Sequence, residues 1–138
     1  MADRLRLELA TPTRLVVSEA ADEVVVPGLD GYFGVLPGHA PLLALVGVGE
    51  IMFRQGRDER YLAVSGGFAE VGPDRVTLLA DTAERAEEID PERARAAQGR
   101  AEERLGARGG EETDYPRALE ALARARTRVE VATRRGAS

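Results

Sequence analysis

The sequence has 138 residues, of which 43% are hydrophobic and 31% are charged, enough for one ordinary domain or for one small domain with an appendage. Because cysteine is absent and histidine occurs once, the composition excludes disulfides, thiol nucleophiles and multi-histidine metal sites. The net charge of −5 and the absence of tryptophan argue against nucleic-acid binding, and no apolar run approaches the roughly 18 residues of a membrane-spanning helix.

The N-terminal part of the chain carries the patterns of short β-strands. Leu5, Leu7 and Leu9 alternate with polar residues, as in a strand with one buried face. β-branched runs follow, and turn signals at 55–58 and 72–74 predict two hairpins. About eight to ten short strands with turns between them favour an antiparallel β-sandwich or a flattened barrel.

The C-terminal part, rich in Ala, Arg and Glu, predicts two helices. Asp90 supplies an N-cap and Pro91 the first helical position of a helix that should run to about Leu105. Asp114 can cap a second helix that should run to about Thr133. The two helices are expected to pack as an antiparallel hairpin.

Each predicted helix has a narrow apolar stripe. The stripes consist of Ala94, Ala97, Ala101 and Leu105 on the first helix, and of Tyr115, Ala118, Leu119, Leu122, Ala125, Val129 and Ala132 on the second. Alanine allows close approach of the backbones but buries little surface, and each site forgoes roughly 1–2 kcal/mol relative to leucine. We therefore expect a hairpin that docks weakly and can move.

Arginines form a second stripe on each helix. They are Arg93, Arg100 and Arg104 on the first helix, and Arg117, Arg124, Arg128 and Arg135 on the second. One interpretation is a site for an anion or an acidic partner, because guanidinium groups match phosphate and carboxylate. The other is a solvated face whose arginines pair with Glu102, Glu103 and Glu120. Spacing alone leaves both open.

No pattern in the sequence indicates an active site. The Gly-rich stretches 46–49 and 65–67 are followed by strand signals rather than by a helix, so we interpret them as turns or bulges and not as phosphate loops. His39 lies in a loop without a recognisable nucleophile or orienting acid. Two classes remain: a subunit that docks into a larger assembly, and a free-standing sensor of a small ligand.

Four stretches carry a resemblance to a known family. They are residues 34–43, 65–71, 76–83 and the pair Asp114–Tyr115. Over nearly the whole chain the sequence resembles the ε subunit of bacterial F-type ATP synthases, the homologue of the mitochondrial δ subunit. The resemblance implies a sandwich of about ten strands over residues 1–83, a linker at 84–89 and a helical hairpin at 90–138.

The resemblance also implies a non-catalytic rotor subunit. In the family, the sandwich holds the foot of the γ subunit and rests on the ring of c subunits, coupling proton-driven rotation to γ. The loop that carries Tyr32, Gly38 and His39 matches the family loop facing that ring. The expected place is peripheral, at the cytoplasmic face of the bacterial inner membrane, without insertion into the bilayer.

In bacterial members the hairpin can extend along γ, reach the catalytic α and β subunits and inhibit ATP hydrolysis. Some members also bind regulatory ATP on the folded hairpin, and the matching positions here are Glu84, Ile89, Asp90, Arg93, Ala94, Arg100, Arg124 and Arg128. No other cofactor is implied. The alternative is a coupling subunit whose hairpin neither inhibits nor senses ATP.

Overall fold

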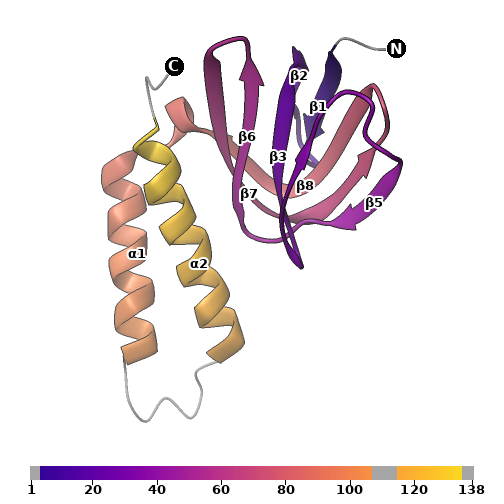
Figure 1. Ribbon diagram of the computed structural model, residues 1–138. Coiled ribbons are helices and arrows are strands. Elements are labelled where there is room, and N and C mark those ends of the chain that lie inside the picture. Colours follow the sequence, from indigo (N-terminus) through magenta and orange to yellow (C-terminus); the bar gives the residue numbers. More distant parts are fainter. Residues whose placement is uncertain (1–3, 107–114, 135–138) are drawn as a thin grey trace.

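The structure, a computed structural model, describes residues 4–106 and 115–134. An eight-stranded β-sandwich is followed by two helices that lie side by side along one side of it (Figure 1). The strands are β1 (Leu5–Ala10), β2 (Leu15–Ala21), β3 (Glu23–Gly28), β4 (Gly31–Val35), β5 (Leu42–Leu45), β6 (Gly49–Gln55), β7 (Asp58–Val71) and β8 (Arg75–Arg85). The short helix η1 (Ala86–Glu88) leads into the helices α1 (Pro91–Gly106) and α2 (Tyr115–Ala132).

The strand order is β2-β1-β8-β7-β6-β3-β4, and β5 pairs with β7. All pairs are antiparallel except β1 with β8, which are parallel. The predicted sandwich with a C-terminal helical pair is confirmed. The described residues form eight strands, within the eight to ten that the patterns predict and fewer than the roughly ten that the resemblance implies. No hairpin turn joins β1 to β8, so local turn signals could not fix their relative direction.

The long strand β7 runs without ending from the first predicted hairpin turn, at 55–58, to the second, at 72–74. Before Gly66 it pairs with β6, and after Gly67 it pairs with β5. Both glycines have positive φ, 66° and 111°, and a Cβ on Gly67 would lie 1.9 Å from the carbonyl oxygen of Leu79. Of the two interpretations of 65–67, a turn or a bulge, the turn is wrong: these glycines let one strand bend without ending, as a bulge does.

Two hydrophobic clusters of different size hold the molecule together. The main core fills the sandwich with large side chains such as Phe53 and the predicted Leu5, Leu7 and Leu9. The second cluster joins the hairpin to the sandwich and consists of Ala63, Ala86, Ile89, Ala94, Val131 and Ala132, with Tyr61 and Val129 at its edge. Small side chains dominate the second cluster, as the alanine stripes predict.

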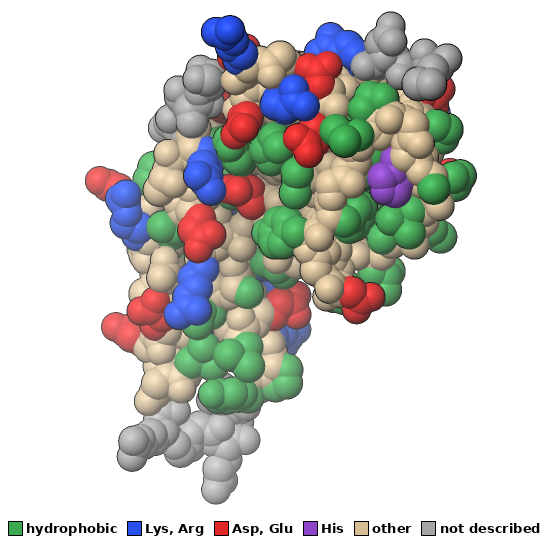
Figure 2. Space-filling model, in the orientation of Figure 1, with side chains coloured by type: hydrophobic (Ala, Val, Ile, Leu, Met, Phe, Trp, Pro, Cys, Tyr) green, Lys and Arg blue, Asp and Glu red, His purple; other side chains and the backbone are tan. Residues whose placement is uncertain are grey.

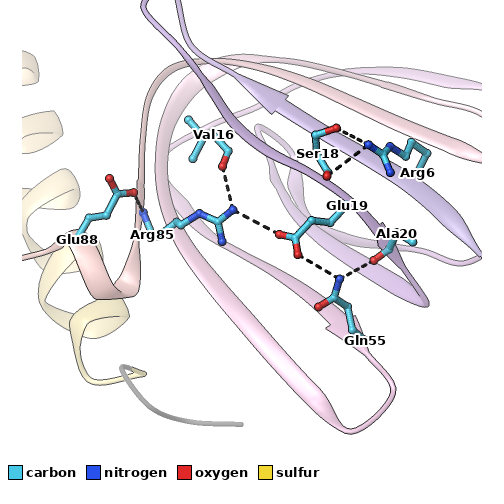
Figure 3. Close-up of polar contacts among 8 residues, drawn as sticks. All are labelled: Arg6, Val16, Ser18, Glu19, Ala20, Gln55, Arg85 and Glu88. Atoms are coloured by element: carbon cyan, nitrogen blue, oxygen red, sulfur yellow. Dashed lines mark hydrogen bonds and ion pairs between the residues drawn. The ribbon is translucent and has the colours of Figure 1, made fainter.

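Side chains cover the outer edge of β2, as Figure 3 shows. Arg85 donates to the carbonyl oxygen of Val16 at 3.0 Å, and Gln55 donates to that of Ala20 at 2.8 Å. Arg85 also pairs with the carboxylate of Glu19 at 3.3 Å. Since β2 ends the strand order, these groups take the place of a neighbouring strand.

The junction between sandwich and hairpin is shorter than the expected linker at 84–89. β8 continues to Arg85, because its last residues pair with 62–64 of β7. Glu88 accepts a hydrogen bond from the backbone N–H of Arg85 at 3.0 Å and forms an ion pair with Arg14 at 2.8 Å. Both contacts lower the pKa of Glu88, with the hydrogen bond from Arg14 the larger cause.

The start of α1 is as predicted. The Asp90 carboxylate accepts hydrogen bonds from the backbone N–H groups of Glu92 and Arg93 at 3.0 and 3.3 Å, and Pro91 is the first helical residue. The proposed capping residue of the second helix, Asp114, lies outside the described residues. Within the described ranges, neither helix is long and apolar enough to cross a membrane.

The predicted apolar stripe of α2 is partly wrong. Ala118, Leu122, Ala125 and Ala132 are buried, but Tyr115 and Leu119 are 58% and 47% exposed. Val131, which the stripe omitted, is fully buried. The C-terminal half of α2 packs on both α1 and the sandwich, so a second face is covered there.

Candidate functional site

A groove of about 390 Å³ lies where α1, α2 and β8 meet. Its lining residues are Arg100 and Arg104 from α1, Arg124 and Arg128 from α2, Thr82 and Glu84 from β8, and the alanines Ala97, Ala101, Ala121 and Ala125. Alanine methyl groups let the helices approach closely, and the arginine stripes flank that seam. The groove therefore brings four guanidinium groups together with one carboxylate.

The charges of the groove are only partly balanced. Arg128 makes a two-point ion pair with Glu84, with N–O distances of 2.7 and 3.2 Å, and Arg124 pairs with Glu120 one turn away at 2.9 Å. Arg100 and Arg104 form no ion pair within the described residues. Two cations thus remain for a ligand whose charge is negative.

The proposed pairing with Glu102, Glu103 and Glu120 holds in one case. Glu120 does pair with Arg124. Glu102 instead accepts a hydrogen bond from the side chain of Gln98 at 2.9 Å. The arginines of α1 are exposed, as a solvated face requires, but their proposed pairing with Glu102 is not found.

Three residues of the family's nucleotide motif have structural tasks. Ile89 and Ala94 are fully buried in the second cluster, and the carboxylate of Asp90 caps α1. Arg93 is exposed and lies one turn before Ala97, outside the lining of the groove. Ile89, Asp90 and Ala94 therefore build the base of the hairpin, and Arg93 does not line the groove.

Of the residues predicted for the site, the groove contains Glu84, Arg100, Arg124 and Arg128. Arg104 belongs to the groove but was absent from the predicted site, although the stripe Arg93–Arg100–Arg104 already placed it on that face. Arg117 does not line the groove, and Arg135 lies outside the described residues.

The sandwich presents a second candidate surface, which sequence reasoning missed. We call it the apolar face, and it consists of Leu29, Tyr32, Leu42, Leu43, Leu45 and Phe68. Leu43 and Leu45 are 71% and 62% exposed beside hollows of about 440 and 400 Å³. Figure 2 shows hydrophobic side chains over the right-hand part of the sandwich, whereas charged side chains of both signs lie on the helices and across the top of the sandwich. Such exposed apolar area is typical of an interface.

The three residues predicted to face a partner ring are not in one loop. Tyr32 lies in β4, and its Oη accepts a hydrogen bond from the backbone N–H of Glu50 at 3.0 Å. Gly38 and His39 follow the other end of β4, where the N–H of Gly38, with φ of 91°, donates to the carbonyl oxygen of Pro73. Tyr32 instead belongs to the apolar face.

Two family descriptions match the chain. Residues 4–86 match "ATP synthase, Delta/Epsilon chain, beta-sandwich domain", and residues 87–133 match "ATP synthase, Delta/Epsilon chain, long alpha-helix domain". The chain is 49% identical over 136 residues to ATP synthase epsilon chain 2 of Syntrophotalea carbinolica, with 99% of each chain covered. It is 50% identical over 132 residues to the ATP synthase epsilon chain of Syntrophobacter fumaroxidans, covering 96% of this chain and 98% of that one.

Solved structures share the fold. A chain of the Euglena gracilis mitochondrial ATP synthase (OSCP/F1/c-ring) superposes with a TM-score of 0.82 at 23% identity, covering 96% of this chain and 83% of that one. A chain of the Tetrahymena thermophila mitochondrial ATP synthase (central stalk/c-ring) gives a TM-score of 0.55 at 14% identity, with 95% of each chain covered. At these identities the likeness concerns the fold alone.

Proposed function

Since the chain belongs to the ATP synthase delta/epsilon chain family, as an epsilon subunit of a bacterial F-type ATP synthase, we propose that it couples rotation of the c-ring to the γ subunit without catalysing a reaction itself. The observation that carries this proposal is the apolar face. Its leucines and Phe68 are exposed and do not belong to the core of the sandwich, which other side chains fill. Exposed apolar side chains of this kind are expected of a subunit that binds partners in an assembly. In this proposal the apolar face seats γ, and the end of the sandwich with Gly38 and His39 rests on the c-ring.

We further propose that the hairpin is a brake on ATP hydrolysis. It is joined to the sandwich by a cluster of mostly small side chains and by the ion pairs Glu84–Arg128 and Glu50–Arg134. Contacts of this kind can break, so that the hairpin separates from the sandwich while the sandwich stays folded. The released helices would extend along γ, where their arginines would meet acidic surfaces of the catalytic α and β subunits.

The groove is our candidate site for regulatory ATP. Arg100 and Arg104 are available to phosphate oxygens, and the volume of the groove lies within the range of small-molecule sites. Glu84 already neutralises Arg128, so a phosphate must compete with a carboxylate there. ATP that binds only when both helices are folded would stabilise the folded hairpin, and falling ATP would favour the extended one.

The brake is tested by ATP hydrolysis of the assembled enzyme carrying this chain truncated after Glu88. That cut retains all of β8, the cover that Arg85 gives to the β2 edge, and the Arg14–Glu88 pair. We expect severalfold faster hydrolysis at low ATP than with the full chain. Equal rates would refute the brake and favour the alternative, a subunit that only couples.

The rotor role is tested separately by assembly. Leu43→Ser and Phe68→Ser should weaken retention of this chain in the purified complex, because both remove exposed apolar surface without touching the core. Leu119→Ser, on the exposed face of α2, is the matched control and should assemble normally. Full retention of the first two variants would remove the apolar face from the proposed interface.

A further inference from the structure

Three residues fasten the C-terminal end of the hairpin to the sandwich. Glu50 of β6 accepts two hydrogen bonds from Arg134, at 3.1 and 3.4 Å, just beyond the end of α2. The guanidinium carbon of Arg134 lies 4.9 Å from the centre of the Tyr61 ring. The Glu50 side chain is only 19% exposed, and the cation of Arg134 close by offsets the cost of burying a carboxylate.

Within the described residues, Arg134 is the only cation at ion-pair distance from Glu50. The pair and the cation–π contact lie next to the small second cluster, which includes Val131 and Ala132. At this end of α2, Arg134 therefore adds an ion pair and a cation–π contact to the apolar contacts of the second cluster.

The backbone that carries Glu50 is itself held from a third strand. Tyr32 of β4 reaches over Gly49 and accepts the N–H of Glu50. A Cβ on Gly49 would lie 2.6 Å from the Tyr32 Oη and 2.6 Å from Cβ of Pro27, so only glycine leaves room for this arrangement. Tyr32 thus fixes the point on β6 from which the Glu50 carboxylate extends to Arg134.

We propose that Glu50, Tyr61 and Arg134 form a clasp that sets how often the C-terminal end of the hairpin leaves the sandwich, and that Tyr32 is its positioning residue. The clasp is a property of the chain by itself, and it stands whether or not the released hairpin inhibits hydrolysis. It differs from the groove, since none of its residues lines that site.

The test is hydrogen exchange of the full chain, read at the backbone amides of the last turn of α2. Arg134→Met and Glu50→Gln should each raise the opening equilibrium there about fivefold. Glu50→Gln removes one partly exposed ion pair, and Arg134→Met removes the cation–π contact as well. The double variant should open no more than the stronger single variant, because both changes remove the same contact. Tyr32→Phe should raise opening about twofold.

Arg126→Met is the matched control, since Arg126 is exposed on the same helix and lies outside the clasp, and it should leave the last turn unchanged. Arg134→Lys, which keeps the charge but not the two-point geometry, should restore part of the protection. Amides of the β7–β8 ladder report whether each variant still folds and should keep their protection. Unchanged exchange in Arg134→Met, or strictly additive effects in the double variant, would overturn the clasp.

Discussion

The sandwich and the hairpin are held by different kinds of contact. Twenty buried residues, mostly Leu, Val, Ile and Phe, form the core of the sandwich, whereas six, four of them alanines, join the hairpin to it. Burial contributes about 25 cal/mol per Å² of apolar surface, so the first cluster stabilises far more than the second. One short chain thus combines a sandwich that has a large core with a hairpin that is attached through a much smaller cluster.

The strongest test of this contrast is Phe53→Ala in the sandwich. Phe53 is fully buried, and its truncation should lower the free energy of unfolding by about 3–5 kcal/mol. Chemical denaturation of the full chain measures the change. Leu119→Ala, on the exposed face of α2, is the control and should shift stability little. A loss below about 1 kcal/mol for Phe53→Ala would mean that the core of the sandwich contributes far less to stability than its burial implies.

Ile89→Ala should weaken the attachment of the hairpin and leave the stability of the sandwich unchanged. Ile89 is the largest side chain of the second cluster and is fully buried, so its truncation should weaken docking by about 2–4 kcal/mol. Hydrogen exchange should show both helices opening while β7 and β8 keep their protection. If the sandwich loses protection to the same degree, the two regions unfold together and the contrast fails.

Substitutions in the groove should have an effect of intermediate size, on the affinity for ATP. If ATP binds there, Arg100→Ala and Arg124→Ala should each weaken binding about tenfold, the loss of one charge-assisted contact of about 1.4 kcal/mol. Isothermal titration calorimetry of the full chain gives the affinities, with Arg126→Ala as an exposed control on the same helix. Arg93→Ala should weaken binding less than Arg100→Ala, since Arg93 lies outside the lining. No measurable heat at millimolar ATP would assign the arginines to other partners.

The smallest effect concerns pH at the junction. The folded-state pKa of Glu88 is lowered, chiefly by its hydrogen bond from Arg14, so this pair stabilises the folded chain above the ordinary glutamate pKa of 4.5. That contribution is lost as pH falls through the lowered value. Unfolding free energies measured from pH 6 down to pH 3 should fall less steeply for Glu88→Gln than for the original chain. Glu103→Gln, exposed on α1, should leave the slope unchanged.

Local patterns predicted the elements better than their connections. The alternation of Leu5, Leu7 and Leu9 and the cap at Asp90–Pro91 describe short-range physics, and both are confirmed. The continuation of β7 through Gly66 and Gly67 depends on β8 lying alongside residues 62–71 of that strand. Glycine in a strand and glycine in a turn look alike until that partner is known.

The site shows the same division. Helical spacing placed Arg100, Arg104, Arg124 and Arg128 on the flank of one seam, where the structure has them. The pairing of Glu84 with Arg128 joins residues 44 positions apart and follows only from the docking of α2 on β8. The apolar face was missed because a strand pattern shows which residues can be buried, but not which face the fold leaves open.

The register of β7 and β8 is the same on both sides of Gly66, and this has a mechanical consequence. Nine residue pairs, from Leu62–Arg85 to Val71–Val76, join the two strands without a shift. Phe68 of the apolar face and Glu84 at the base of the hairpin belong to this one ladder. Because antiparallel rungs run across the strands, a force directed along either strand loads them together in shear. The nine pairs therefore share such a force, so that a pull applied near Phe68 is also carried by the pairs beside Glu84.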